Sequence, residues 1–267
     1  MLNHMRCVGD SNIPGIFVTT KEELEEKWKI HGIQAVYLID QIELLRVIKQ
    51  LGGACIYLEK QNGIICCEAD YIWQMSDETD VPDDTYIQRV WQRHMHLPWL
   101  ITKTEHLILR ESVMEDLPCF QQFYKEERDN PDVQQLCEGE EQLHTYITTR
   151  YPLFEYGLWT IVDKATGTVF GRAGIEELPE DYGDLAGEPE LSYLIGKEYR
   201  GSGIAQEACQ AILHYAAEEL EMKRIYLRTS RENFHSRKLA EKLGLLKVES
   251  ITEYKDLLYC GLLTFER

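Results

Sequence analysis

Short hydrophobic runs alternate with amphipathic stretches in the first hundred residues of the chain. The runs are rich in β-branched and aromatic residues, which is typical of strands, and they cover residues 15–19, 35–39, 55–58 and 70–74. Helical patterns between and after them cover residues 21–29, 41–51 and 84–94. Strands that alternate with helices predict a small parallel sheet, so residues 1–103 are assigned to a Rossmann-like βαβ module.

The order of elements changes from residue 104 onward. Strand-like runs cover residues 107–110, 156–162, 169–176, 191–195, 225–229, 247–251 and 258–265. Helical patterns cover residues 113–127, 140–150, 205–220 and 234–243. The resulting order βααβββαβαββ predicts a mixed sheet flanked by helices over residues 104–267, and a mixed α/β fold class for the whole chain.

Composition narrows the class of protein and of partner. Hydrophobic residues make up 44% of the chain, and no run reaches the roughly 18 apolar residues that span a bilayer. We therefore expect a soluble, cytoplasmic protein, with its oligomeric state open and a homodimer among the choices. The formal net charge of −18 disfavours nucleic acid and anionic membranes as partners.

The eight cysteines show no CxxC pair, and the neighbours Cys66 and Cys67 lie beside a predicted strand. We expect buried, reduced thiols and no metal site. His94 and His96 have no further ligands nearby in the sequence, so helix-end roles are expected for them.

A glycine turn, Arg200-Gly201-Ser202-Gly203-Ile204-Ala205, lies between a predicted strand and a predicted helix. Glycines let the backbone approach a ligand closely, and the free N–H groups at a helix start attract a phosphate. A Rossmann dinucleotide turn needs GxGxxG and an acid after the next strand, where Arg228-Thr229 stands instead. The Gly-Lys-Ser/Thr of a Walker P-loop is absent as well.

Two motifs resemble the GNAT acetyltransferase superfamily over residues 104–267. The turn fits the pattern Gln/Arg-x-x-Gly-x-Gly/Ala, and Asn233-x-x-Ser236-x-x-Leu239-x-Glu241-Lys242-Leu243-Gly244-Leu245 resembles the family's second motif. The resemblance implies that acetyl-CoA is the cosubstrate and that an acetyl group passes to a primary amine. It also implies the cofactor-binding residues Tyr193, Leu194, Ile195, Arg200, Gly201, Ser202, Gly203, Ile204, Ala205, Gln206, Asn233 and Ser236. Asn233 is equally a good helix N-cap.

Both familiar catalytic positions of the family are vacant in this sequence. The family's frequent tyrosine acid would fall at Ala240, and a base position used by some relatives falls at Arg228. Candidate bases are Glu190, where the strand before the turn begins, and Glu176, at the end of the preceding strand; both also suit solvated strand ends. Tyr193 is a candidate donor to the thiolate or oxyanion, with packing as its alternative role, and the resemblance implies an oxyanion contact from the N–H of residue 194 or 195.

The segment 176–190 contains seven acids and no basic residue. In the GNAT family this connection lies near the acceptor end of the cleft, so a cationic amine is the expected acceptor; a plain solvated loop is the other interpretation. Two other functions stay open: a non-catalytic acyl-CoA sensor, and a scaffold that recruits partners.

Residues 36–58 weakly resemble the later half of a haloacid-dehalogenase-like or other Rossmann-type domain, because the strand ends in Asp40 and leads into a helix. Such hydrolases also need an Asp-x-Asp nucleophile after an earlier strand, where Thr19-Thr20 stands. No phosphatase activity is expected, and a structural or dimerising module is the simplest interpretation.

Overall fold

A computed structural model describes residues 13–60, 68–77, 79–127, 139–248 and 256–263. The chain divides into two compact units, Met1–Trp99 and Leu100–Arg267. Within the described residues, no helix is both long and apolar enough to cross a membrane.

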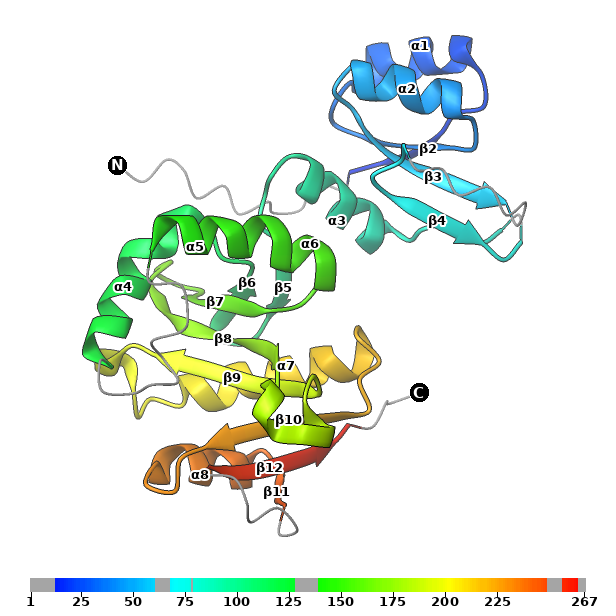
Figure 1. Ribbon diagram of the computed structural model, residues 1–267. Helices are drawn as coiled ribbons and strands as arrows, with labels where there is room; N and C mark the ends of the chain where they lie inside the picture. The colour runs from blue at the N-terminus through cyan, green and yellow to red at the C-terminus, as the bar shows by residue number, and fades with distance from the viewer. Residues whose placement is uncertain (1–12, 61–67, 78, 128–138, 249–255, 264–267) are drawn as a thin grey trace. The chain divides into compact units, whose positions relative to one another are not determined.

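The first unit is a four-stranded parallel sheet in the order β1-β2-β3-β4 (Figure 1). Its elements are β1 (Gly15–Phe17), α1 (Lys21–His31), β2 (Val36–Ile39), α2 (Ile42–Gln50), β3 (Ala54–Lys60), β4 (Ile72–Met75) and α3 (Asp84–His94). Alternate side chains of β2 and β3 pack against α1 and α2 on one face and against α3 on the other. The predicted parallel sheet is confirmed.

The polar residues of this unit have structural partners. The Thr20 hydroxyl accepts the Glu23 N–H at 3.2 Å and caps α1, while Asp40 pairs with Lys60 at 2.7 Å. His94, near the end of α3, lies 3.1 Å from the carbonyl oxygen of Gly52. No group of three potential metal ligands occurs among the described residues, and Cys66 and Cys67 lie outside them.

The second unit is an eight-stranded mixed sheet in the order β11-β12-β10-β9-β8-β7-β6-β5. Its strands are β5 (Leu100–Lys103), β6 (Leu107–Arg110), β7 (Leu158–Asp163), β8 (Val169–Glu177), β9 (Pro189–Ile195), β10 (Arg224–Thr229), β11 (Leu246–Lys247) and β12 (Leu257–Leu262). Strands β6 to β9 form an antiparallel meander. The pattern missed β5, a short edge strand whose register with β6 shifts after Leu100.

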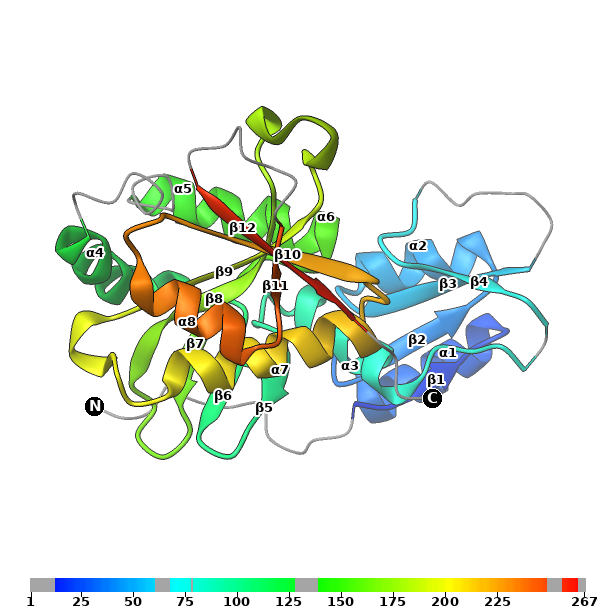
Figure 2. The same cartoon turned by 90° about the horizontal axis from the view of Figure 1, so that it is seen from below.

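Helices cover both faces of this sheet, with α7 and α8 on one face and α4 to α6 on the other (Figure 2). The helical elements are η1 (Met114–Asp116), α4 (Leu117–Glu126), α5 (Glu140–Thr145), η2 (Tyr146–Arg150), α6 (Tyr151–Phe154), η3 (Glu180–Leu185), η4 (Lys197–Tyr199), α7 (Ile204–Glu218) and α8 (Phe234–Lys242). The segment predicted as one helix over residues 140–150 continues to Phe154, and its middle turn, η2, is a π-helix. Pro152 follows this turn and lacks the N–H of a regular helical residue.

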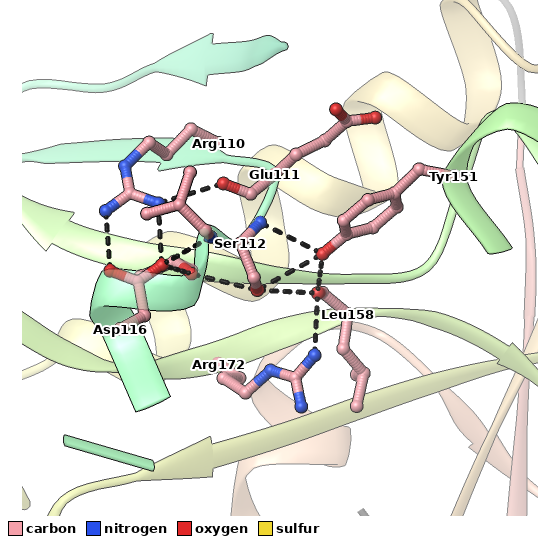
Figure 3. Close-up of polar contacts among 9 residues, drawn as sticks. Arg110, Glu111, Ser112, Asp116, Tyr151, Leu158 and Arg172 are labelled. Carbon is pink, nitrogen blue, oxygen red and sulfur yellow. Dashed lines mark hydrogen bonds and ion pairs between the residues drawn. The ribbon is translucent and has the colours of Figure 1, made fainter. Parts of the chain in front are cut away.

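A buried polar network joins α4 to the start of the sheet (Figure 3). Asp116 is 3% exposed and accepts hydrogen bonds from Arg110 at 2.7 and 2.8 Å. It also accepts the Val113 N–H at 3.0 Å and the Thr160 hydroxyl at 2.8 Å. Removing one partner of a buried ion pair leaves the other charge buried without compensation, which destabilises the folded protein.

We predict that Asp116→Ala lowers the free energy of unfolding by about 3 to 5 kcal/mol, because Arg110 loses its buried counter-charge. Urea denaturation measures the change. The exposed neighbour variant Glu115→Ala is the control and should change stability by less than about 0.5 kcal/mol. Equal effects of the two substitutions would contradict the importance of the network.

Candidate functional site

The glycine turn joins the carboxyl end of β9, through η4, to the start of α7. Gly201 and Gly203 have φ angles of 81° and 91°, in the left-handed region that favours glycine. A Cβ atom added to either glycine would meet nothing within 4 Å, so the space beside the turn is open. The first N–H groups of the 15-residue helix α7 have no partner inside the helix. The turn therefore has the geometry of an anion site.

Polar side chains fix the shape of this turn. The Arg200 guanidinium donates to the carbonyl oxygen of Ile195 at 2.9 Å and to Glu127, at the end of α4, at 2.6 Å. The Ser202 hydroxyl donates to the carbonyl oxygen of Tyr199 at 2.6 Å. Arg200 thus anchors the turn to the end of β9 and to α4.

The first turn of α7 is further linked to two neighbouring elements. The Lys242 ammonium donates to the Gln206 side chain at 3.3 Å, which brings a positive charge from α8 close to the helix start. The Glu207 carboxylate accepts hydrogen bonds from the Thr104 hydroxyl at 2.5 Å and the His106 N–H at 2.9 Å. Glu207 therefore links the first turn of α7 to the β5–β6 connection by hydrogen bonds.

Strands β9 and β10 diverge beside the turn. In the described part of the chain they share one paired position, Glu190 with Tyr226. From residue 191 to residue 195, β9 continues to pair with β8 but has no ladder to β10 among the described residues. The backbone of Tyr193, Leu194 and Ile195 thus lies on a strand edge without a ladder to β10 in the described part of the chain.

Asn233 and Ser236 lie at the start of α8, and Tyr193 lies near Ser236. Asn233 is the N-cap of α8, and its side-chain oxygen accepts the Ser236 N–H at 3.0 Å. The Tyr193 side chain lies near Ser236 of α8 and Cys209 of α7. Burial raises the pKa of Tyr193 to about 12, so the phenol keeps its proton at neutral pH.

Glu176 and Glu190 lie directly opposite each other on the antiparallel strands β8 and β9. Side chains at opposed positions share one face of a sheet. Tyr193 is three residues from Glu190 in the same strand, so it points to the other face, toward α7 and α8. The structure therefore brings the two candidate bases together and sets the candidate acid on the opposite face.

The two glutamates have different surroundings. Glu190 is 5% exposed and pairs with the Arg228 guanidinium, whose Nε lies 3.2 Å from its Oε1; Arg228 also lies over the ring of Tyr182. Burial raises the pKa of the Glu176 carboxyl, and this effect outweighs the opposing charges of Arg172 and Arg150. A carboxylate with a raised pKa is the better proton acceptor.

Arginines neutralise part of the acidic segment 176–190. Glu177 accepts two hydrogen bonds from Arg150 at 2.7 and 2.8 Å, and Glu188 lies 3.5 Å from Arg224. Three acids of η3 remain exposed to solvent, Glu180, Asp181 and Asp184. The buried side chain of Tyr182 packs this segment against Tyr226 and Leu258 of the sheet.

Three residues beside the candidate site were not predicted from the sequence. Tyr146 of η2 lies near Glu176, Arg172 is buried in the middle of β8, and Glu127 binds Arg200. Arg172 had a readable signal, because an arginine inside an otherwise apolar strand requires buried partners. The partners of Tyr146 and Glu127 depend on long-range packing.

The helix start with its open glycine turn lies next to a strand edge that has no ladder to β10 among the described residues. Residues 106–246 match the acetyltransferase (GNAT) domain family, and the chain belongs to that family. The sequence is 30% identical over 101 residues to the uncharacterized N-acetyltransferase YjdG of Bacillus subtilis. The aligned stretch covers 38% of this chain and 58% of that protein. The chain thus spans little more than half of that relative.

Solved structures share the fold. An acetyltransferase from Agrobacterium tumefaciens str. C58 superposes with a TM-score of 0.50 at 25% identity, over 60% of this chain and 92% of its own. RimL, a ribosomal L7/L12 alpha-N-protein acetyltransferase in complex with coenzyme A, superposes with a TM-score of 0.50 at 15% identity, over 62% and 98% of the two chains.

We predict that Gly203→Glu abolishes binding of CoA, because it places bulk and negative charge at the helix start where the pyrophosphate would lie. Isothermal titration calorimetry measures the loss. Gly187→Glu is a matched control, since Gly187 also has a positive φ, 83°, and open space around its Cβ position. Unchanged CoA affinity in Gly203→Glu would exclude this turn as the binding site.

Proposed function

We propose that the protein is an N-acetyltransferase that moves an acetyl group from acetyl-CoA to a primary amine. The observation that carries the proposal is the combination of the open turn at residues 200–203 with the carboxylates of Glu176 and Glu190 next to the β9–β10 divergence. The residues present fit the cosubstrate: open space and positive φ at both glycines suit a pyrophosphate, and the β9 edge suits an extended pantetheine arm.

When bound, acetyl-CoA supplies an activated acetyl thioester. The amides and side chains of residues 200–206 would hold the pyrophosphate, and the edge formed by Tyr193, Leu194 and Ile195 would hold the pantetheine arm, with Asn233 and Ser236 beside it. A backbone N–H of Leu194 or Ile195 would stabilise the oxyanion. These contacts bring thioester and amine together, which by itself supplies much of the rate.

Glu176 is the proposed general base. An ammonium group must lose a proton before its nitrogen can attack, and a carboxylate whose pKa is raised by burial accepts that proton more readily. Glu190 is committed to Arg228 and is the alternative base. Tyr193 keeps its phenol proton but lies on the opposite face of β9 from both glutamates, so water is the proposed proton donor to the leaving thiolate.

The proposed acceptor is a cationic primary amine. Support comes from the exposed acids Glu180, Asp181 and Asp184 of η3, which leave a negative field after the neighbouring pairs with arginines are formed. RimL acts on a protein N-terminus, and at 15% identity this likeness concerns the fold alone. A protein N-terminus, a lysine, a polyamine and a small amine all belong to the proposed class.

We expect steady-state turnover of acetyl-CoA with a panel of amines, and we expect Glu176→Gln to lower kcat by roughly 10²-fold or more. Part of this loss should be recovered at high pH, where the amine is already neutral. Glu190→Gln should lower kcat less than about 10-fold. A larger loss in Glu190→Gln would move the base to that residue, and binding of acetyl-CoA without turnover of any amine would make the protein a sensor.

Charge on the acceptor provides a separate prediction. The triple variant Glu180→Gln, Asp181→Asn, Asp184→Asn should reduce kcat/KM for cationic amines by roughly 3- to 10-fold and leave CoA affinity unchanged, with a smaller effect at high salt. A triple variant of Glu22, Glu25 and Glu26 to Gln on α1 changes the net charge equally and is the control. Equal losses in both triple variants would reject a local field.

A further inference from the structure

The Arg228 guanidinium lies between two carboxylates that come from neighbouring strands. Its Nε donates to Oε1 of Glu190, the second residue of β9, at 3.2 Å. Its Nη1 lies 3.7 Å from Oδ2 of Asp256, which directly precedes β12. Arg228 itself belongs to β10, the strand between β9 and β12 in the sheet. One guanidinium therefore neutralises acids on both sides of its own strand.

This cluster is largely removed from water. The side chains of Glu190 and Asp256 are 7% and 15% exposed. The buried ring of Tyr182, from η3, has its centroid 5.8 Å from Cζ of Arg228. Buried ion pairs are screened little by salt, and a buried carboxylate that loses its cation is destabilised. Both acids therefore depend on Arg228.

Charged and titratable groups approach Glu190 from each element packed on this face. Glu176 lies directly opposite on β8, Asp256 precedes β12, and Tyr182 comes from η3. Arg228 supplies the positive charge in direct contact with the Glu190 carboxylate. The negative charges of Glu176 and Asp256 near Glu190 are thus balanced from β10.

The arginines near Glu176 are arranged differently. Arg150, from η2, donates two hydrogen bonds to the next residue, Glu177. Burial outweighs the opposing charges of Arg172 and Arg150 and raises the pKa of the Glu176 carboxyl. A carboxylate in an ion pair loses basicity to its cation, whereas a desolvated carboxylate gains it. The two opposed glutamates therefore differ in their arginine contacts.

We propose that Arg228 is a positioning residue that leaves the role of base to Glu176, because it holds Glu190 in an ion pair and keeps it from accepting the proton of the amine. This proposal rests on the proposed function, in which an N–H bond of the ammonium breaks and an O–H bond forms on the Glu176 carboxylate. Without Arg228, Glu190 on the same face can accept that proton instead.

A rescue experiment tests this assignment of roles. Adding Arg228→Gln to Glu176→Gln should raise kcat by roughly 3- to 10-fold over Glu176→Gln alone, because Glu190 is freed to act as the base. Arg224→Gln in the same background is the matched control. Arg224 also belongs to β10 and lies 3.5 Å from Glu188, so its removal should leave kcat unchanged.

NMR titration of ¹³C-labelled glutamate carboxyls gives a readout that needs no turnover. In Arg228→Gln the titration midpoint of Glu190, assigned through Glu190→Gln, should move upward by roughly one pH unit or more, because the charged form loses its counter-charge. Arg224→Gln should leave this midpoint in place. Arg228→Lys keeps a cation on a different geometry, so it should give a smaller upward shift, and it provides the same test if Arg228→Gln does not fold.

An unmoved Glu190 titration in the Arg228 variants would overturn the proposal, and so would a double variant no faster than Glu176→Gln. The proposed function survives both results when the wild type acetylates amines and Glu176→Gln is slow. A Glu176→Gln enzyme with full kcat would instead remove Glu176 as the base, and the role of Arg228 would be lost with it.

Discussion

The divergence of β9 from β10 after the single pair of Glu190 with Tyr226 is the constraint on which the site depends. Two parallel strands that separate leave a strand edge inside the sheet instead of at its border. The turn at residues 200–203 follows the end of that edge, and α7 and α8 begin next to it. The open glycine turn and the strand edge without a ladder to β10 therefore arise from one feature of the backbone.

The two faces of β9 have different chemistry. Tyr193 meets α7 and α8, while Glu190 and its cross-strand neighbour Glu176 lie on the face covered by α4 to η2. Arg228 neutralises Glu190, and burial raises the pKa of Glu176. Two carboxylates on one face therefore have different partners and different surroundings.

The sequence predicted much of this arrangement and missed its long-range part. The turn, α7, the Asn233 cap and the parallel sheet of the first unit follow from local patterns and are observed. Both glutamates were chosen as strand ends, but their register depends on pairing across the segment that joins β8 to β9. β5, the π-helix turn and the Glu190–Arg228 pair likewise depend on tertiary contacts that local propensity does not contain.

A crystal structure of the protein with bound CoA is the most direct test of this account. We expect the pyrophosphate at the amides of residues 202–205, the pantetheine arm along residues 193–195 of β9, and the thiol on the face that carries Glu176. A pyrophosphate bound elsewhere, or a thiol that opens onto the opposite face away from both glutamates, would contradict the account.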